Sequence, residues 1–291
     1  MIRPASKNPL VIGRAAALLV LALAAASCAA QTVPAAPFEP VVGQAGKDVI
    51  WVPTPPILIE RMLRMAQTTA RDTVIDLGAG DGRIAITAAR DFGARSFGLE
   101  FNPDMVTLSR REAEKAGVAN RATFQEADIY KTDFSHANVL TMYLLPNINL
   151  DLRPTILKMK PGTRVVSHQF NMGDWTPDDT SDFSGRMAYM WIVPAKVDGR
   201  WAIEIPGSPA MHFTLALKQE YQRVSGTAGP GKTTFGLRDT VIQGAQLRFS
   251  FVDDDGRLRE FVATVNVDAM NGEVRIDGAP GVRFSALRSG T

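Results

Sequence analysis

The chain has few of the residues that build disulfides, metal sites and covalent catalytic centres. Among its 291 residues there are one cysteine, Cys28, and three histidines. A single cysteine excludes a disulfide within the chain, and no spacing of His, Cys, Asp and Glu matches a metal-binding pattern. No Ser-His-Asp or Cys-His arrangement indicates a protein nucleophile. We therefore expect neither a disulfide scaffold nor a metal site, and no triad chemistry.

Long apolar runs are also missing, apart from one near the start. Residues 15–26 are apolar but too short to span a bilayer comfortably. Basic residues precede this run and small residues follow it, which is the pattern of a secretory signal. We expect residues 1–27 to be a signal peptide and the protein to be exported. Cys28 lies where a lipoprotein signal places its lipidated cysteine, but Ala25 stands where leucine is usual, so the sequence leaves open whether the protein is periplasmic or lipid-anchored.

A charge excess of one sign is absent once this segment is removed. The whole chain has 32 Lys plus Arg and 30 Asp plus Glu, a net charge of +2. Residues 1–27 contain three basic residues and no acidic ones, which leaves 29 basic against 30 acidic residues and a net charge of −1. Without a basic bias we expect no nucleic-acid partner, and membrane contact only through a lipid at Cys28.

Residues 49–205 alternate between strand patterns and helix patterns. The predicted strands are residues 72–77, 94–101, 122–126, 139–145 and 164–168, and the predicted helices are residues 57–66, 83–92, 103–116 and 150–159. Such alternation predicts an α/β fold with a Rossmann-like, mainly parallel sheet and helices on both faces. Ligands of these sheets bind beyond the carboxyl ends of the strands.

The segments on either side differ in composition. Residues 28–48 are rich in Pro, Ala and Gly and predict a flexible linker. Residues 206–291 contain short segments with partial alternation between turn residues, which predict a small antiparallel β domain. Residues 226–233 match the P-loop pattern letter for letter, but polar residues precede them and Gly236 interrupts the expected helix. We interpret them as a glycine-rich loop.

A strand, a glycine turn and a helix follow one another at residues 74–86. Gly78, Gly80 and Gly82 alternate after Asp76, so the spacing is D-x-G-x-G-x-G. Glycine is needed where φ is positive or where a ligand approaches the main chain closely, and the amides that open the helix favour an anion. The dinucleotide fingerprint would place its third glycine one residue later. On these residues alone, an ordinary tight turn and a nicotinamide site are the alternatives.

Residues 76–82 resemble motif I of the class I S-adenosylmethionine-dependent methyltransferases. Residues 50–201 as a whole are similar to a bacterial branch related to the small lysine methyltransferases that act on the ATP synthase c-ring protein and the adenine nucleotide carrier. Besides the glycine motif, the segments that carry this similarity are Val52–Pro55, Tyr143–Pro146, Lys160–His168 and Trp191–Trp201. The resemblance implies S-adenosyl-L-methionine as the cofactor. It also implies an unidentified methyl acceptor, with a protein lysine amine among the candidates.

Three carboxylates stand where this cofactor would bind. Glu100 ends the second strand about twenty residues after the glycine loop, where a carboxylate can accept both ribose hydroxyls. Asp128 ends the third strand and is expected to accept the exocyclic amine of adenine, and Asp76 to face the cofactor's ammonium group. For Glu100 and Asp128 the alternative is an ordinary acid at a strand end. By resemblance, Thr54 would close over the methionine end.

Methyl transfer itself needs an aligned nucleophile, a dry pocket and the loss of a proton from an ammonium acceptor. His168 ends a central strand and is a candidate to orient the acceptor or take its proton, with a buried structural histidine as the alternative. Tyr143 is the second candidate. It opens the segment Tyr143–Pro146, which lies where many amino-group methyltransferases carry an Asn-Pro-Pro-Tyr-like loop but lacks its asparagine and paired prolines.

Export conflicts with this chemistry, since S-adenosylmethionine is made in the cytosol. A second hypothesis is therefore a non-catalytic binding module of the cell envelope that retains the methyltransferase fold. A nucleotide-sugar or nicotinamide enzyme is a third. The retained glycines together with Glu100 and Asp128 favour cofactor binding in either of the first two cases.

Overall fold

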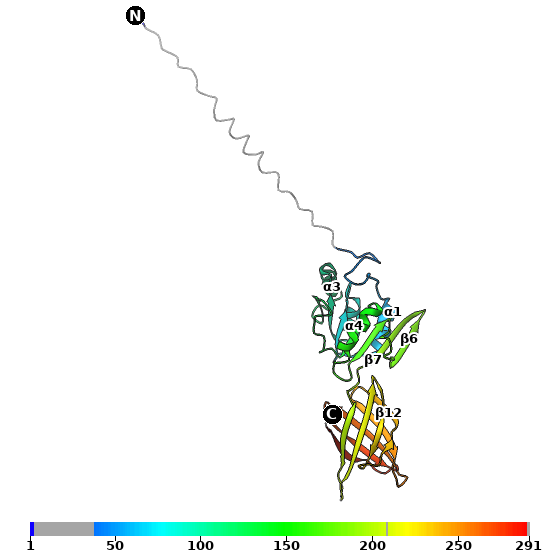
Figure 1. Ribbon diagram of the computed structural model, residues 1–291. Coiled ribbons are helices and arrows are strands. Elements are labelled where there is room, and N and C mark those ends of the chain that lie inside the picture. Colours follow the sequence, from blue (N-terminus) through cyan, green and yellow to red (C-terminus); the bar gives the residue numbers. More distant parts are fainter. Residues whose placement is uncertain (3–37, 208, 290–291) are drawn as a thin grey trace. The chain divides into compact units, whose positions relative to one another are not determined.

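The computed structural model describes residues 1–2, 38–207 and 209–289. Residues 3–27 of the predicted signal peptide, Cys28 and the first part of the predicted linker lie outside these residues. Residues from Phe38 onward form one compact unit that contains two β-sheets. Figure 1 shows the first sheet in cyan to green and the second in yellow to red. In the described part of the chain, no helix has the length and apolar character needed to cross a membrane.

The first sheet has seven strands in the order β3-β2-β1-β4-β5-β7-β6. Their bounds are β1 Thr73–Leu77, β2 Arg95–Glu100, β3 Ala122–Glu126, β4 Val139–Met142, β5 Arg164–His168, β6 Asp179–Phe183 and β7 Arg186–Ile192. Strands β1 to β5 pair in parallel, while β7 is antiparallel to β5 and β6. The strand order reverses between β1 and β4, and this is the edge where such sheets bind ligands.

Helices cover both faces of this sheet. They are α1 (Pro56–Met65), α2 (Arg83–Asp91), α3 (Pro103–Lys115) and α4 (Pro146–Ile156). Along β4, Val139 packs with Leu58 of α1, whereas its neighbour Leu140 packs with Ile148 of α4. Successive strand residues point to opposite faces, so each face has its own core. The predicted Rossmann-like fold is therefore confirmed, although α4 begins at Pro146 rather than residue 150 because proline is well placed in a first helical turn.

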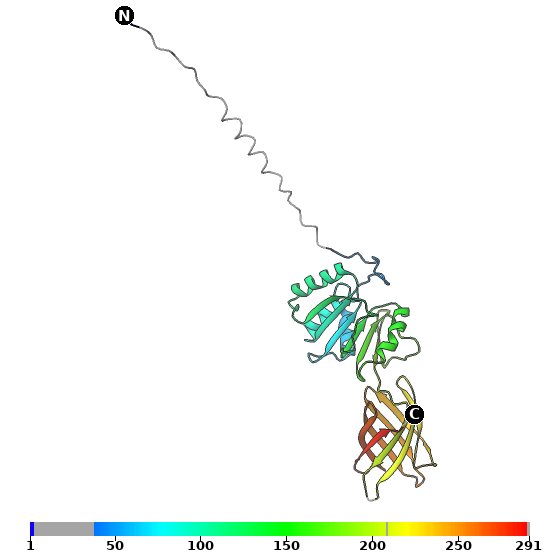
Figure 2. The same ribbon diagram turned by 60° about the vertical axis from the view of Figure 1, so that its left-hand side comes forward.

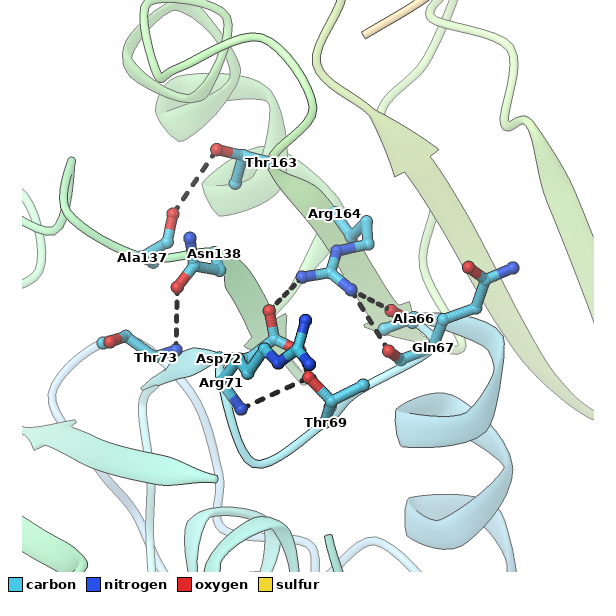
Figure 3. A network of polar contacts seen from close by, with 10 residues as sticks. All are labelled: Ala66, Gln67, Thr69, Arg71, Asp72, Thr73, Ala137, Asn138, Thr163 and Arg164. Atoms are coloured by element: carbon cyan, nitrogen blue, oxygen red, sulfur yellow. Dashed lines mark hydrogen bonds and ion pairs between the residues drawn. The ribbon is translucent and has the colours of Figure 1, made fainter. Parts of the chain in front are cut away.

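A polar network ties the amino ends of the strands to the end of α1 (Figure 3). Arg164 of β5 forms an ion pair with Asp72 and donates to the carbonyl oxygens of Ala66 and Gln67, at 2.9 and 3.2 Å. Asp72 also accepts the Thr69 amide at 2.7 Å. These bonds satisfy polar groups at the sheet edge that faces away from the glycine loop, so this edge stabilises the fold rather than a ligand.

The second sheet has nine antiparallel strands in the order β11-β10-β9-β8-β16-β15-β14-β13-β12. Their bounds are β8 Gly199–Ile205, β9 Met211–Glu220, β10 Arg223–Gly229, β11 Phe235–Gly236, β12 Arg238–Gln243, β13 Gln246–Val252, β14 Leu258–Asn266, β15 Ala269–Ile276 and β16 Val282–Arg288. The sheet curls round on itself, and β10 contacts β12 (Figure 2). Its interior is filled with side chains that include Trp201, Phe251 and Phe261.

Two features of this part differ from the sequence predictions. Strand β8 belongs to the second sheet, so that sheet begins at Gly199, before the predicted boundary at residue 206. The P-loop-like segment is strand β10 followed by a short turn, and no helix follows it. A Cβ on Gly226 would lie 2.0 Å from the Ala216 carbonyl oxygen, so close strand pairing explains this glycine without a nucleotide.

Residues 43–51 form a short structure that we call the N-terminal hairpin. The Gly43 amide donates to the Trp51 carbonyl, and the Trp51 amide donates to the Gln44 carbonyl, each at 2.9 Å. The Gly46 amide donates to the Val49 carbonyl at 2.8 Å and closes the tip. Residues 43–48 of the predicted linker therefore contain a turn held by main-chain bonds, which composition does not reveal.

Candidate active site

The loop from β1 to α2 has a backbone that only glycine adopts without strain. Gly80 and Gly82 have φ values of 56° and 80°. A Cβ on Gly80 would come within 2.8 Å of the Trp51 indole nitrogen, and one on Gly82 within 2.7 Å of the Phe124 ring. Both positions therefore need glycine for conformation and for space. Gly78 belongs to the same turn, where its amide donates to the Leu99 carbonyl at 2.9 Å.

Glu100 anchors this loop. One of its carboxylate oxygens accepts the Gly80 amide at 2.8 Å, and the other accepts the Asn102 amide at 2.9 Å. Each carboxylate oxygen has two lone pairs, so one on each is left for a ribose hydroxyl. The ribose role stays a prediction, and the structure adds a second role, in holding the glycine loop, that sequence reasoning missed.

Asp76 is almost completely buried, with 2% of its surface exposed. It accepts a hydrogen bond of 2.7 Å from the Thr141 hydroxyl on β4. Burial raises the pKa of Asp76 to about 7, against the lowering effect of that hydrogen bond and with smaller contributions from Asp81 and Glu100. Burial disfavours the ionised form of this carboxyl group, and a cation on a bound ligand would stabilise it. Thr141 was not predicted from sequence; the one signal is a polar residue within the otherwise apolar β4.

The predicted residues surround a cavity of about 620 Å³ beyond the carboxyl ends of β1, β2 and β4. Those that line it are Thr54, Asp76, Gly78, Gly80, Glu100 and Tyr143. Gly82 lies beneath the loop against Phe124, and Asp128 lines a smaller neighbouring cavity of about 60 Å³. His168 itself does not line the main cavity. It contacts Thr54 and Tyr143, whose side chains do.

His168 and Tyr143, the two candidate catalytic residues, are in direct contact. Their ring centroids lie 3.8 Å apart, and His168 Nδ1 is 3.0 Å from the Thr54 hydroxyl. His168 is 3% exposed, and burial, aided by the charge of Arg186, lowers its pKa to about 4. Burial also raises the pKa of Tyr143. At neutral pH the imidazole and the phenol are therefore both uncharged.

Two residues that sequence reasoning did not identify also shape the cavity. Arg83, the first residue of α2, forms an ion pair with Asp81 and donates to the Thr54 carbonyl at 3.2 Å, so it links the glycine loop to the segment before α1. Phe170 follows β5, lines the cavity and stacks on Tyr143 with 6.2 Å between ring centroids. In the described part of the chain, no cluster of three or more His, Cys, Asp or Glu side chains forms a metal site.

Comparison with known proteins gives a consistent result. The family model of the ANTKMT methyltransferase domain matches residues 76–179. A protein-lysine N-methyltransferase of Saccharolobus islandicus (strain REY15A) is 44% identical over 133 residues, which cover 45% of this chain and 83% of the relative. The adenine nucleotide translocase lysine N-methyltransferase of Mus musculus is 31% identical over 137 residues, or 46% of this chain and 54% of the relative, so the match spans about half of that protein.

Among solved structures, an RNA methyltransferase from Salinibacter ruber in complex with S-adenosyl-L-homocysteine is 47% identical. The match covers 50% of this chain and 96% of that chain, with a TM-score of 0.49. The residues that the family model matches, 76–179, run from the end of β1 to the start of β6 and include α2, α3 and α4.

Replacing Glu100 with alanine tests the glycine-loop site. Each lost hydrogen bond to a charged group typically costs about 1.5–3 kcal/mol, so Glu100→Ala should weaken S-adenosylmethionine binding by about ten- to more than hundredfold in calorimetric titration. Glu100→Gln, which keeps one acceptor oxygen, should lose less. Asp254→Ala, in a turn of the second sheet, is the control and should bind like the parent. Parental affinity in Glu100→Ala would refute the ribose assignment.

The raised pKa of Asp76 predicts pH-dependent cofactor affinity. The ionised carboxylate is the form that attracts the cofactor's ammonium group, and it becomes scarce as the pH falls through about 7. Affinity should therefore drop by about tenfold for each pH unit below that value and level off above it. Asp76→Asn should bind more weakly at pH 8 and show a flat profile between pH 5 and pH 8. A parental affinity that does not change over this range would contradict the assignment.

Proposed function

This chain belongs to the ANTKMT methyltransferase family, and we propose that this S-adenosylmethionine-dependent enzyme methylates a lysine amine of a protein partner. The observation that carries the proposal is the contact of uncharged His168, Tyr143 and Thr54 beside a cavity that also contains Asp76 and the glycine loop. The Saccharolobus relative, matched over 83% of its length, is described as a protein-lysine N-methyltransferase.

The residues of the cavity fit the proposed cofactor. Asp76 is buried and forms no ion pair with any cation in the described ranges, so it suits the cofactor's ammonium group. Gly78 and Gly80 line the cavity and present main-chain atoms to it. Glu100 presents acceptor oxygens for hydroxyls, and Asp128 one for an exocyclic amine. When bound, the cofactor supplies an activated methyl group.

The acceptor side is mainly apolar and aromatic. Tyr143, Phe170 and Leu145 line the cavity there. An apolar wall suits the aliphatic stem of lysine, and aromatic faces attract its ammonium group. The exclusion of water also lowers the cost of removing the charge from that amine, because a desolvated ammonium loses its proton more easily.

Positioning of the uncharged acceptor amine is the step for which we propose a role of His168. A lysine amine attacks carbon only as the free base, yet its ordinary pKa is about 10.4. The His168 imidazole is neutral and its Nδ1 lies 3.0 Å from the Thr54 hydroxyl, which itself lines the cavity. We propose that the acceptor amine loses its proton to solvent as it enters the apolar cavity, and that the Thr54 hydroxyl, which His168 Nδ1 holds, accepts a hydrogen bond from the free amine and orients it. The new N–C bond uses the amine lone pair, and the electrons of the broken S–C bond stay on sulfur.

Transfer of a labelled methyl group to protein fractions tests this function. We expect His168→Ala to lower the transfer rate by about a hundredfold, because the Thr54 hydroxyl that orients the acceptor loses its partner, with cofactor affinity and melting temperature close to the parent. His212→Ala, at an exposed position of β9, is the matched control and should keep the parental rate. A strong loss of melting temperature with normal transfer would make His168 structural.

The acceptor is identified by digesting the labelled protein. Label on lysine supports the proposal, and label on another residue or on RNA refutes the lysine assignment. Cofactor binding without transfer to any fraction would instead favour the alternative, a non-catalytic binding module of the cell envelope.

We propose further that the protein is exported, either as a free periplasmic protein or as a lipoprotein anchored through Cys28. The support is the sequence pattern of residues 1–30, which lie almost entirely outside the described ranges. We expect the mature chain to begin at or near Cys28 and Cys28→Ser to abolish labelling by a radioactive fatty acid. Unchanged labelling would refute the anchor, and a mature chain that retains Met1 would refute export.

A further inference from the structure

Lys47 extends from the tip of the N-terminal hairpin to the predicted adenine ligand. Its ammonium nitrogen is 3.1 Å from Asp128 Oδ2. The same nitrogen lies 4.7 Å from the centroid of the Phe101 ring and 5.9 Å from that of Tyr130. One cation thus contacts a carboxylate and two aromatic rings. This contact was not expected from the sequence, where residues 28–48 resemble a linker.

The other oxygen of Asp128 is already engaged in its own turn. Oδ1 accepts the Tyr130 amide at 3.1 Å, which leaves Oδ2 as the oxygen that faces Lys47. Lys131 also lies 3.5 Å from Oδ2, but its side chain is 82% exposed, against 35% for Lys47. Backbone and lysine contacts together lower the pKa of Asp128. Oδ2, the oxygen without a main-chain donor, is thus the freer acceptor for an adenine amine, and it is the one that Lys47 contacts.

The hairpin tip also takes up space beside Asp128. The cavity between them measures about 60 Å³, and Lys47, Asp48 and Val49 form one wall of it. Phe101 and Ile129 belong to its other walls. The main cavity next to it, which contains Asp76 and Glu100, is about ten times larger at 620 Å³. The part of the site that holds Asp128 is thus narrow because the hairpin tip lies over it.

Lys47 contacts the two kinds of group that would recognise adenine, a carboxylate and an aromatic ring. A carboxylate oxygen accepts an exocyclic amine, and an aromatic face stacks on a purine ring. The lysine ammonium is likewise a donor to the carboxylate and a cation for the ring face. Its ion pair is partly exposed, and such pairs are weak enough to exchange for a competing ligand.

We infer that Lys47 occupies the adenine subsite of the cofactor-free enzyme and that adenine displaces its ammonium from Asp128 on binding. The N-terminal hairpin is then an internal competitor of the cofactor, with Trp51 against Gly80 at its base and Lys47 at its tip. This inference rests on the cofactor pocket proposed above and adds to it a residue that sets the affinity and rate of cofactor binding.

Lys47→Met tests the inference, because methionine keeps most of the side chain's length and removes its charge. Binding of S-adenosylhomocysteine and of 5′-methylthioadenosine, which both carry adenine, is measured by calorimetry and stopped-flow fluorescence. We expect the variant to bind both ligands about three- to tenfold more tightly and to associate faster, in line with the loss of one weak ion pair and two weak cation–π contacts. The difference from the parent should shrink as salt screens the ion pair.

Two variants serve as controls. Lys131→Met removes the other lysine near Asp128 and should bind like the parent, and Lys47→Arg should restore parental behaviour. Equal or weaker binding by Lys47→Met, while the parent binds S-adenosylhomocysteine normally, would overturn the role of Lys47 and leave the proposed function intact. If neither the parent nor Lys47→Met binds S-adenosylhomocysteine, both the inference and the proposed function fail.

Discussion

The hydrogen bond from the Gly80 amide to the Glu100 carboxylate is the contact on which the site depends. The Gly80 peptide is held from both sides, since its carbonyl accepts the Ser109 hydroxyl of α3 at 2.8 Å. Glu100 ends β2 and Gly80 follows β1, so the register of two parallel strands positions the loop. Glycine at this point admits Trp51 of the N-terminal hairpin, and the hairpin in turn brings Lys47 to Asp128. The glycine loop thus connects the sheet, the cavity and the N-terminal hairpin.

Burial determines the charges around the cavity before any ligand binds. It raises the pKa of Asp76 to about 7 and lowers that of His168 to about 4, so both groups tend toward their uncharged forms near neutral pH. The effects suit two different tasks, because a ligand cation can stabilise the Asp76 carboxylate and a neutral imidazole can hold the Thr54 hydroxyl by a hydrogen bond. Thr141 and Thr54 provide the hydroxyls that orient these two groups.

Much of the first sheet could be predicted because its signals are local. The apolar run of β1, the glycines after it and the apolar pattern of α2 occupy consecutive residues, and their hydrophobic periods differ between strand and helix. The acids at the ends of β2 and β3 followed from the same alternation. Predictions were poorer where prolines or glycines had to be interpreted, as at Pro146, which begins α4, and at Gly226, which lies within β10.

The sequence by itself determined the Rossmann-like sheet, the glycine loop and the acids at the strand ends. The strands and helices follow from hydrophobic periodicity, and the loop follows from glycines at positions where the backbone needs them. Only the tertiary structure decided that Thr141 faces Asp76, that Thr54 meets His168 and that Lys47 meets Asp128. The last two pairs are separated by 114 and 81 residues along the chain. No local pattern encodes such contacts, because they arise only when packing of the sheet and the hairpin brings distant segments together.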